Sequence, residues 1–131
     1  MNQPTFNISL RFSGDDLIPD DISECLDCKP TEAFFRGEEV KSGKFVRIQR
    51  TGVWLLTESS DGTFDERVLI LLERCTNSIE RWQLLTSRFN PDLFVGVFAS
   101  SVQSAFSISE ETLSRLSARG IGMSLDLYCN L

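Results

Sequence analysis

The sequence predicts an α+β fold in which a mainly antiparallel or mixed sheet of four to five strands has its helices packed on one face. Residues 5–12 alternate apolar and polar side chains with the period of two that marks a half-buried strand. Residues 64–89 instead repeat apolar side chains at helical spacing. Strand-like segments at 93–99 and 123–128 flank a further helical stretch, so the element order is typical of layouts related to the ferredoxin-like fold.

Size and composition indicate one soluble domain spanning residues 1–131. A chain of this length buries enough surface to fold without disulfides or metal ions. Its net charge of −6 repels phosphate backbones, so we expect no nucleic-acid partner. The first ten residues lack the basic start and apolar run of a signal peptide, and no apolar run is long enough to span a bilayer. We therefore expect a cytoplasmic protein with no membrane partner and with reduced cysteines.

The front part of the chain contains a short helix and two further strands. Pro19 sets the backbone for a helix start, and the acidic residues that follow it favour the positive end of the helix dipole, which predicts a helix from about Pro19 to Asp27. Residues 45–49 and 52–57 are rich in strand-forming side chains, and we interpret them as a hairpin.

The segment Phe64 to Phe89 predicts a long central helix. Apolar residues recur there at seven-residue intervals at Val68, Cys75, Trp82 and Phe89. Poor helix formers around Asn77 interrupt the segment, and Asn77 is a candidate cap for a second helical segment, with Glu80 three positions on. We expect either one helix with a kink near Asn77 or two nearly collinear helices.

The same segment has two further features that bear on how it packs. A seven-residue repeat of this kind also suits the contact stripe of a coiled-coil dimer. Leu69, Ile70 and Leu84 lie outside that stripe, however, and apolar residues on more than one side of a helix favour packing within the domain. We therefore expect a monomer or a weak homodimer. A row of arginines at the same spacing is expected to form an outer flank paired with acids; its members are Arg67, Arg74, Arg81 and Arg88.

Five segments distributed over nearly the whole chain carry a family resemblance. They are residues 7–14 (NISLRFSG), 26–31 (LDCKPT), 36–38 (RGE), 52–54 (GVW) and 120–128 (GIGMSLDLY). In these segments the chain resembles the bacterial domain-of-unknown-function family numbered 4279. The resemblance implies a shared fold and a bacterial origin, and it supplies no catalytic residue. The chain departs from the family pattern at Asp27 and Cys28, where a glycine and an aliphatic residue are expected, so Cys28 is interpreted as a core substitution.

The residue types argue against catalysis. Histidine is absent, which removes the commonest general base and metal ligand, and we expect a non-enzyme without cofactor or metal. Cys25 and Cys28 form a CxxC motif, but it lies at the C-terminal end of a predicted helix, where the dipole disfavours a thiolate. We interpret all four cysteines as structural, and a redox pair or a zinc site with Cys75 and Cys129 is the alternative.

The stretch from Lys29 to Trp54 is locally basic on an acidic molecule. One interpretation is purely structural, a hairpin and turn with solvated basic side chains and Trp54 in the core. The other is a binding surface, because aromatic and arginine side chains concentrate interface energy. Its candidate residues are Phe34, Phe35, Arg36, Gly37, Glu38, Lys41, Lys44 and Trp54.

Three hypotheses follow for the function. The leading one is a non-enzymatic module that binds another protein, as an accessory protein or an immunity-type inhibitor. The second is a dimeric ferredoxin-like sensor that binds a small anionic ligand. The third is a cysteine-based redox or zinc protein.

Overall fold

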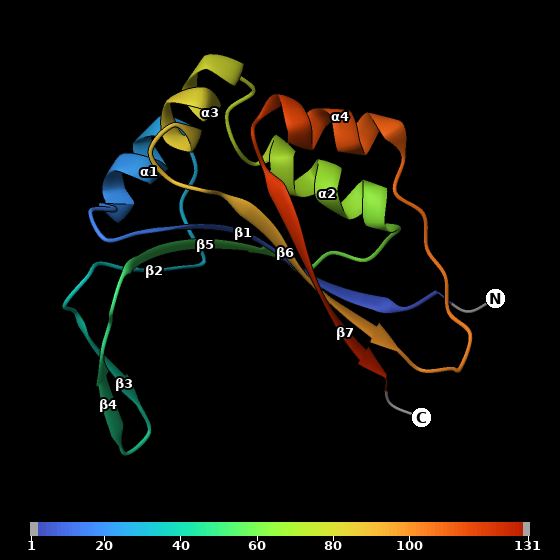
Figure 1. The fold of residues 1–131 in the computed structure, drawn as a ribbon, viewed down its shortest axis with the longest axis horizontal. Coiled ribbons are helices and arrows are strands. Elements are labelled where there is room, and N and C mark those ends of the chain that lie inside the picture. The colour runs from blue at the N-terminus through green and yellow to red at the C-terminus, as the bar shows by residue number, and fades with distance from the viewer. Residues whose placement is uncertain (1–2, 130–131) are drawn as a thin grey trace.

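Helices cover one face of a five-stranded sheet, and a separate two-stranded hairpin extends from the opposite side (Figure 1). The structure, a computed structural model, describes residues 3–129. The sheet has the order β2 (Glu32–Phe34), β5 (Gly52–Glu58), β1 (Thr5–Gly14), β6 (Asp92–Ala99) and β7 (Gly122–Cys129). Its helices are α1 (Pro19–Leu26), α2 (Phe64–Glu73), α3 (Ile79–Thr86) and α4 (Glu110–Ala118). The predicted α+β class and five-stranded sheet are confirmed.

Strand β1 lies at the centre of the sheet and pairs antiparallel with β5 on one side and with β6 on the other. Helix α4 connects β6 to β7, and these two strands are parallel, so the sheet is mixed. The alternation predicted for β1 is confirmed: Ile8, Leu10 and Phe12 are fully buried beneath the helices. On the other face, Arg11 donates two hydrogen bonds to the carboxylate of Asp92, at 2.9 and 2.7 Å.

Aromatic side chains join the sheet to the helices. The Phe12 ring packs edge-on against Trp54 of β5, with centroids 5.8 Å apart, and lies nearly parallel to Trp82 of α3 at 6.3 Å. Both indole N–H groups have acceptors, since Trp54 donates to Ser23 Oγ at 3.0 Å and Trp82 donates to the Thr76 carbonyl at 2.8 Å. Large aromatic side chains with satisfied polar atoms stabilise a core strongly.

The long central helix predicted for residues 64–89 is wrong, because the segment forms two short helices. Helix α2 ends at Glu73, and α3 begins only at Ile79, where the Ser78 hydroxyl rather than Asn77 caps it by accepting from the Arg81 N–H at 3.4 Å. Between the helices, the Thr76 N–H donates to the Leu26 carbonyl at 2.7 Å, which binds the connection to the end of α1. Figure 1 shows α2 beside α4 and α3 beside α1.

The heptad pattern persists across this break because both helices turn their apolar sides to one core. Val68, Cys75, Trp82 and Phe89 are all buried. Leu84, which lies outside this repeat on α3, is 65% exposed. An apolar residue outside the repeat is therefore no evidence that the helix is buried on several sides.

The predicted pairing of residues 45–49 with 52–57 is also wrong. Strand β4 (Phe45–Ile48) pairs with β3 (Glu39–Ser42), whereas β5 pairs with β1 and β2. The β3–β4 connection is a two-residue loop in which Gly43 has φ +62°, a conformation that glycine adopts without strain and that suits tight hairpins. None of the helices within residues 3–129 combines the length and apolar character needed to cross a bilayer.

Asp27 closes α1 in a left-handed conformation. Its φ is +54°, and it is the only non-glycine residue in the described part of the chain with a positive φ. The Cys28 N–H donates back to the Ser23 carbonyl at 3.1 Å, so the helix ends in the manner that usually selects glycine.

Replacing Asp27 with glycine is therefore expected to raise the free energy of unfolding by about 1 kcal/mol, because a Cβ disfavours this conformation. Urea denaturation followed by circular dichroism measures the change. Asp27→Ala is the matched control and should give no gain; an equal gain from both variants would mean that the charge, not the backbone, is responsible.

A carboxylate on α2 holds the start of α4. Asp65 Oδ1 accepts from Thr112 Oγ1 at 2.7 Å and from the Ser109 N–H at 3.1 Å, and the Ser109 hydroxyl also caps α4. Burial by itself raises the pKa of Asp65, but these hydrogen bonds outweigh it and hold the pKa below its ordinary value. The ionised form thus stabilises the fold.

Because the folded-state pKa is lowered, this stabilisation is present above the unfolded-state pKa of about 4 and is lost as the pH falls through the lower folded value. Asp65→Asn is expected to lose about 1 kcal/mol of stability at pH 7, and the deficit should shrink at pH 3. Urea denaturation at both pH values tests this. A deficit that is the same at both would contradict the role assigned to the charge.

Candidate functional site

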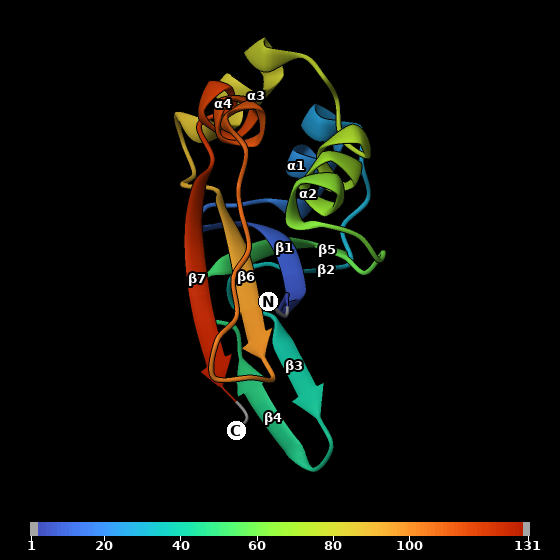
Figure 2. The same cartoon turned by 90° about the vertical axis from the view of Figure 1, so that its right-hand side faces the viewer.

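The most distinctive surface is an arm formed by residues 35–50, which contains β3 and β4. Figures 1 and 2 show it projecting from the sheet on the side away from the helices. Two backbone hydrogen bonds extend its ladder to the base, from the Gly37 N–H to the Gln49 carbonyl and from the Gln49 N–H to the Glu38 carbonyl, each at 2.9 Å. Gly37 has φ +90°, so the turn that leads into the arm requires a glycine-like backbone.

The arm exposes apolar side chains on both faces. Phe45 is 80% exposed, and Val46 and Ile48 are 57% and 56% exposed. Because neighbouring residues of a strand point to opposite faces, Phe45 lies on one face of the hairpin, and Val46 and Ile48 lie on the other. An isolated two-stranded hairpin is marginally stable in water, so this one gains little from its own contacts.

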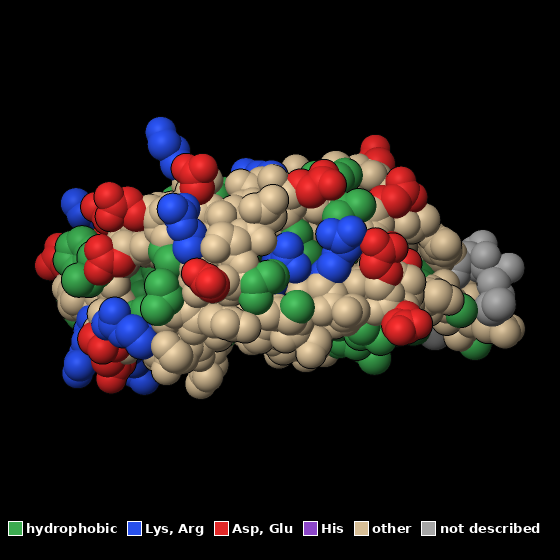
Figure 3. All heavy atoms as spheres, turned by 90° about the horizontal axis from the view of Figure 1, so that it is seen from above, with side chains coloured by type: hydrophobic (Ala, Val, Ile, Leu, Met, Phe, Trp, Pro, Cys, Tyr) green, Lys and Arg blue, Asp and Glu red, His purple; other side chains and the backbone are tan. Residues whose placement is uncertain are grey.

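The arm is also basic. It contains five lysine or arginine residues and two glutamates, a net charge of +3 on a chain whose total is −6. Arg36 approaches Asp15 at 3.7 Å, but both side chains are exposed and the pair contributes little. Within the described residues, Lys41 and Lys44 form no ion pair. The helix-covered face seen in Figure 3 differs, since acidic and basic side chains are interspersed there.

The structure brings together most of the residues predicted for a binding surface. Phe35, Arg36, Lys41 and Lys44 lie on the arm, and Phe35 is 57% exposed. Gly37 and Glu38 shape its base, where Glu38 Oε1 accepts from the Phe35 N–H at 3.3 Å.

Two of the predicted residues lie apart from the arm. Phe34 ends β2 and is half-buried. Trp54 is fully buried in the core, so it cannot contact a partner.

The most exposed apolar residues of the arm were missed from the sequence. Phe45, Val46 and Ile48 are strand-forming residues, so the sequence predicts a strand over 45–49 that pairs with 52–57 rather than a free-standing hairpin. The signal that reveals the correct pairing is Gly43, placed between two strand-like segments as the first residue of a two-residue loop.

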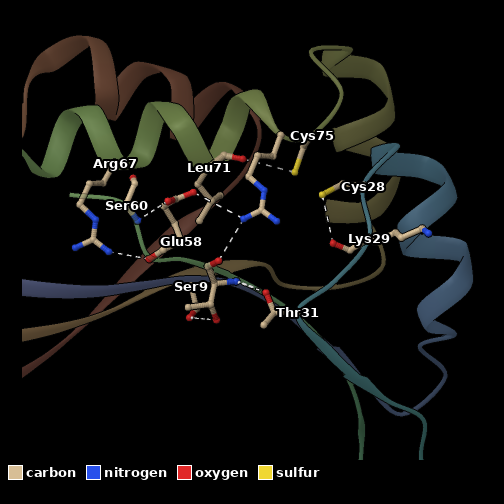
Figure 4. A network of polar contacts seen from close by, with 11 residues as sticks. Ser9, Cys28, Lys29, Thr31, Glu58, Ser60, Arg67, Leu71 and Cys75 are labelled. Atoms are coloured by element: carbon tan, nitrogen blue, oxygen red, sulfur yellow. Dashed lines mark hydrogen bonds and ion pairs between the residues drawn. The ribbon is translucent and has the colours of Figure 1, made fainter. Parts of the chain in front are cut away.

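A cavity at the start of β1 contains Arg67, which is buried and does not lie on the outer flank predicted for it. Its terminal amino groups donate to the carbonyls of Phe6 and Glu58, both at 2.7 Å, and Figure 4 shows the bond to Glu58. Among residues 3–129, its Nε and the Ser60 hydroxyl find no hydrogen-bond partner. Glu58 and Asp61 line the same cavity. Because two amino groups of the guanidinium are already bonded to carbonyls and two acidic residues contribute to the lining, the cavity disfavours an anionic ligand.

Glu58 itself is stabilised in its charged form. Burial alone raises the pKa of Glu58, but the hydrogen bond from the Ser60 N–H and the nearby charges of Arg74 and Arg67 outweigh burial and lower the pKa below its ordinary value. The Ser60 N–H lies 2.7 Å from Glu58 Oε1. We therefore interpret the cluster of Glu58, Ser60 and Arg67 as a structural support for the loop before α2.

The cysteines do not assemble a metal site in the described residues, where no three potential ligands gather. Cys25 Sγ lies 3.3 Å from the Arg81 carbonyl on α3, and burial raises the pKa of this thiol. Cys129 ends β7, on a different element from the other three.

Comparison with known proteins gives one match. Searches of curated proteins and of solved structures found nothing similar, so the predicted relation to ferredoxin-like layouts stays a prediction. The family model described as "Domain of unknown function (DUF4279)" matches residues 4–130, which span the sheet, all four helices and the arm. The chain therefore belongs to the DUF4279 family of domains of unknown function, as the resemblance in its sequence indicated.

Proposed function

We propose that this protein is a non-enzymatic binding module that contacts another protein through the arm of residues 35–50. The observation that carries the proposal is the hairpin itself, which projects from the fold with apolar side chains exposed on both faces. The role fits an accessory protein or an immunity-type inhibitor, in which a small domain occupies a surface of its partner.

The chemistry of the arm defines the partner. Full burial of Phe45 or Ile48 would contribute about 1.5–3 kcal/mol each, so the partner is expected to present an apolar hollow. Lys41 pairs across the hairpin with Val46, and Lys44 directly precedes Phe45, so positive charge lies beside the exposed apolar residues and calls for an acidic rim around that hollow. Acidic surfaces elsewhere on this chain would repel the same partner and favour docking by the arm alone.

The absence of histidine from the sequence supports a non-enzymatic role. The alternative of an anion sensor gains no support from the cavity at Arg67, for the reasons given above. A zinc protein gains none from the cysteine positions within residues 3–129.

The binding proposal predicts a selective loss of affinity. Wild-type protein is used to capture partners from its native cells, and each candidate is then purified and titrated calorimetrically. Phe45→Ser is expected to raise the dissociation constant about 10- to 100-fold, because the apolar burial is lost. Lys41→Glu with Lys44→Glu is expected to slow association and to reduce the dependence of binding on salt.

Leu84→Ser is the matched control, since Leu84 is a similarly exposed apolar residue on α3, away from the arm. It should leave the affinity unchanged. The free energy of unfolding of Phe45→Ser should also stay within about 0.5 kcal/mol of wild type, because the Phe45 side chain is 80% exposed. A partner that binds wild type, Phe45→Ser and the charge-reversed variant equally would overturn the proposal.

A further inference from the structure

Two cysteines that are distant in sequence face each other beneath the helices. Cys28 follows the end of α1, and Cys75 follows the end of α2 (Figure 4). The hydrogen bond from the Thr76 N–H to the Leu26 carbonyl, 2.7 Å long, fixes the two chain segments side by side. The two sulfur atoms lie next to each other, and each has a backbone carbonyl as its nearest polar contact: Cys28 Sγ lies 3.5 Å from the Lys29 carbonyl, and Cys75 Sγ lies 3.9 Å from the Leu71 carbonyl (Figure 4).

The other thiols point elsewhere. Cys25 is separated from Cys28 by one helical turn, but its Sγ is directed to the Arg81 carbonyl of α3 at 3.3 Å. Cys129 belongs to β7 and is exposed. The pair that the fold creates is thus Cys28 with Cys75, not the CxxC pair visible in the sequence.

The two paired thiols differ in their access to solvent. Cys75 is buried, and its pKa is raised to about 12, chiefly by that burial and further by the neighbouring Cys28. Cys28 is half-buried and lines an open hollow between the end of α1 and Lys29. An oxidant in solution therefore reaches Cys28 first, while Cys75 stays protonated behind it.

We propose that Cys28 and Cys75 form a reversible dithiol–disulfide site that hydrogen peroxide oxidises. The Cys28 thiol loses its proton, the thiolate attacks one oxygen of hydrogen peroxide, and the O–O bond breaks; the leaving hydroxide takes up that proton, so a sulfenic acid and one water result. The Cys75 sulfur then attacks the Cys28 sulfur, the S–O bond breaks, and the released hydroxide takes the Cys75 proton to form a second water. Two thiols lose two electrons and two protons, and the peroxide is reduced to two waters.

The disulfide would tie together both ends of the segment that carries the arm and β5, since residues 29–74 lie between the two cysteines. A cross-link around a segment of this length restricts the unfolded chain strongly. The oxidised protein is therefore the more stable form, and a thiol reductant returns it to the dithiol form.

The test uses the full chain with Cys129→Ser, which prevents links between molecules. After treatment with hydrogen peroxide and alkylation of remaining thiols, the protein should lose two hydrogens in mass and accept one alkyl group, on Cys25. Peptide mapping should recover Cys28 joined to Cys75. The melting temperature should rise by about 5–15 °C and return after treatment with dithiothreitol.

Cys25→Ser in the same background is the control and should form the link at the same rate. Cys75→Ala and, separately, Cys28→Ser should abolish the link and the rise in melting temperature, so the test does not depend on one variant folding. A dominant Cys25–Cys28 link, or Cys28 and Cys75 both alkylated after peroxide treatment, would overturn the proposal.

Discussion

The fold depends on the burial of one side of β1. Ile8, Leu10 and Phe12 are fully buried, β5 and β6 pair with β1 on its two sides, and α2 packs over it. Phe12 contacts the indoles of both Trp54 and Trp82, and so couples β5 and α3 to the central strand. Dense packing of this kind leaves little freedom for substitution, because a smaller side chain leaves a cavity and a larger one forces strain.

This core ends where the arm begins, so the proposed binding surface is separate from the buried core. Gln49 is buried at the base of the arm, yet all four residues of β4 are exposed. Phe45 and Ile48 are exposed, so they contribute little to the stability of the body of the protein. Their apolar surface is free for a contact with a partner, and a hairpin with so few contacts to the body can adjust its conformation on binding.

Features set by local side-chain pattern could be predicted from the sequence. The buried side of β1, the start of α1 at Pro19 and the basic character of residues 29–54 needed only local rules. The wrong predictions involved competition between local and distant contacts. The stripe from Val68 to Phe89 keeps its phase whether the helix is continuous or broken, and the break depends on the bond between Thr76 and Leu26, which no local pattern reveals. The exposure of Phe45 likewise depends on which strand β4 pairs with, and the Cys28–Cys75 contact arises only once α1 and α2 are packed.

The arm has few contacts with the body of the protein, and we propose that it becomes ordered when a partner binds. Hydrogen–deuterium exchange of the backbone amides, with and without that partner, measures this. In the free protein, amides of residues 39–48 should exchange orders of magnitude faster than those of residues 8–12, and the partner should protect the arm selectively. Equal protection of the arm and of β1 in the free protein, or protection of another surface in the complex, would contradict the account.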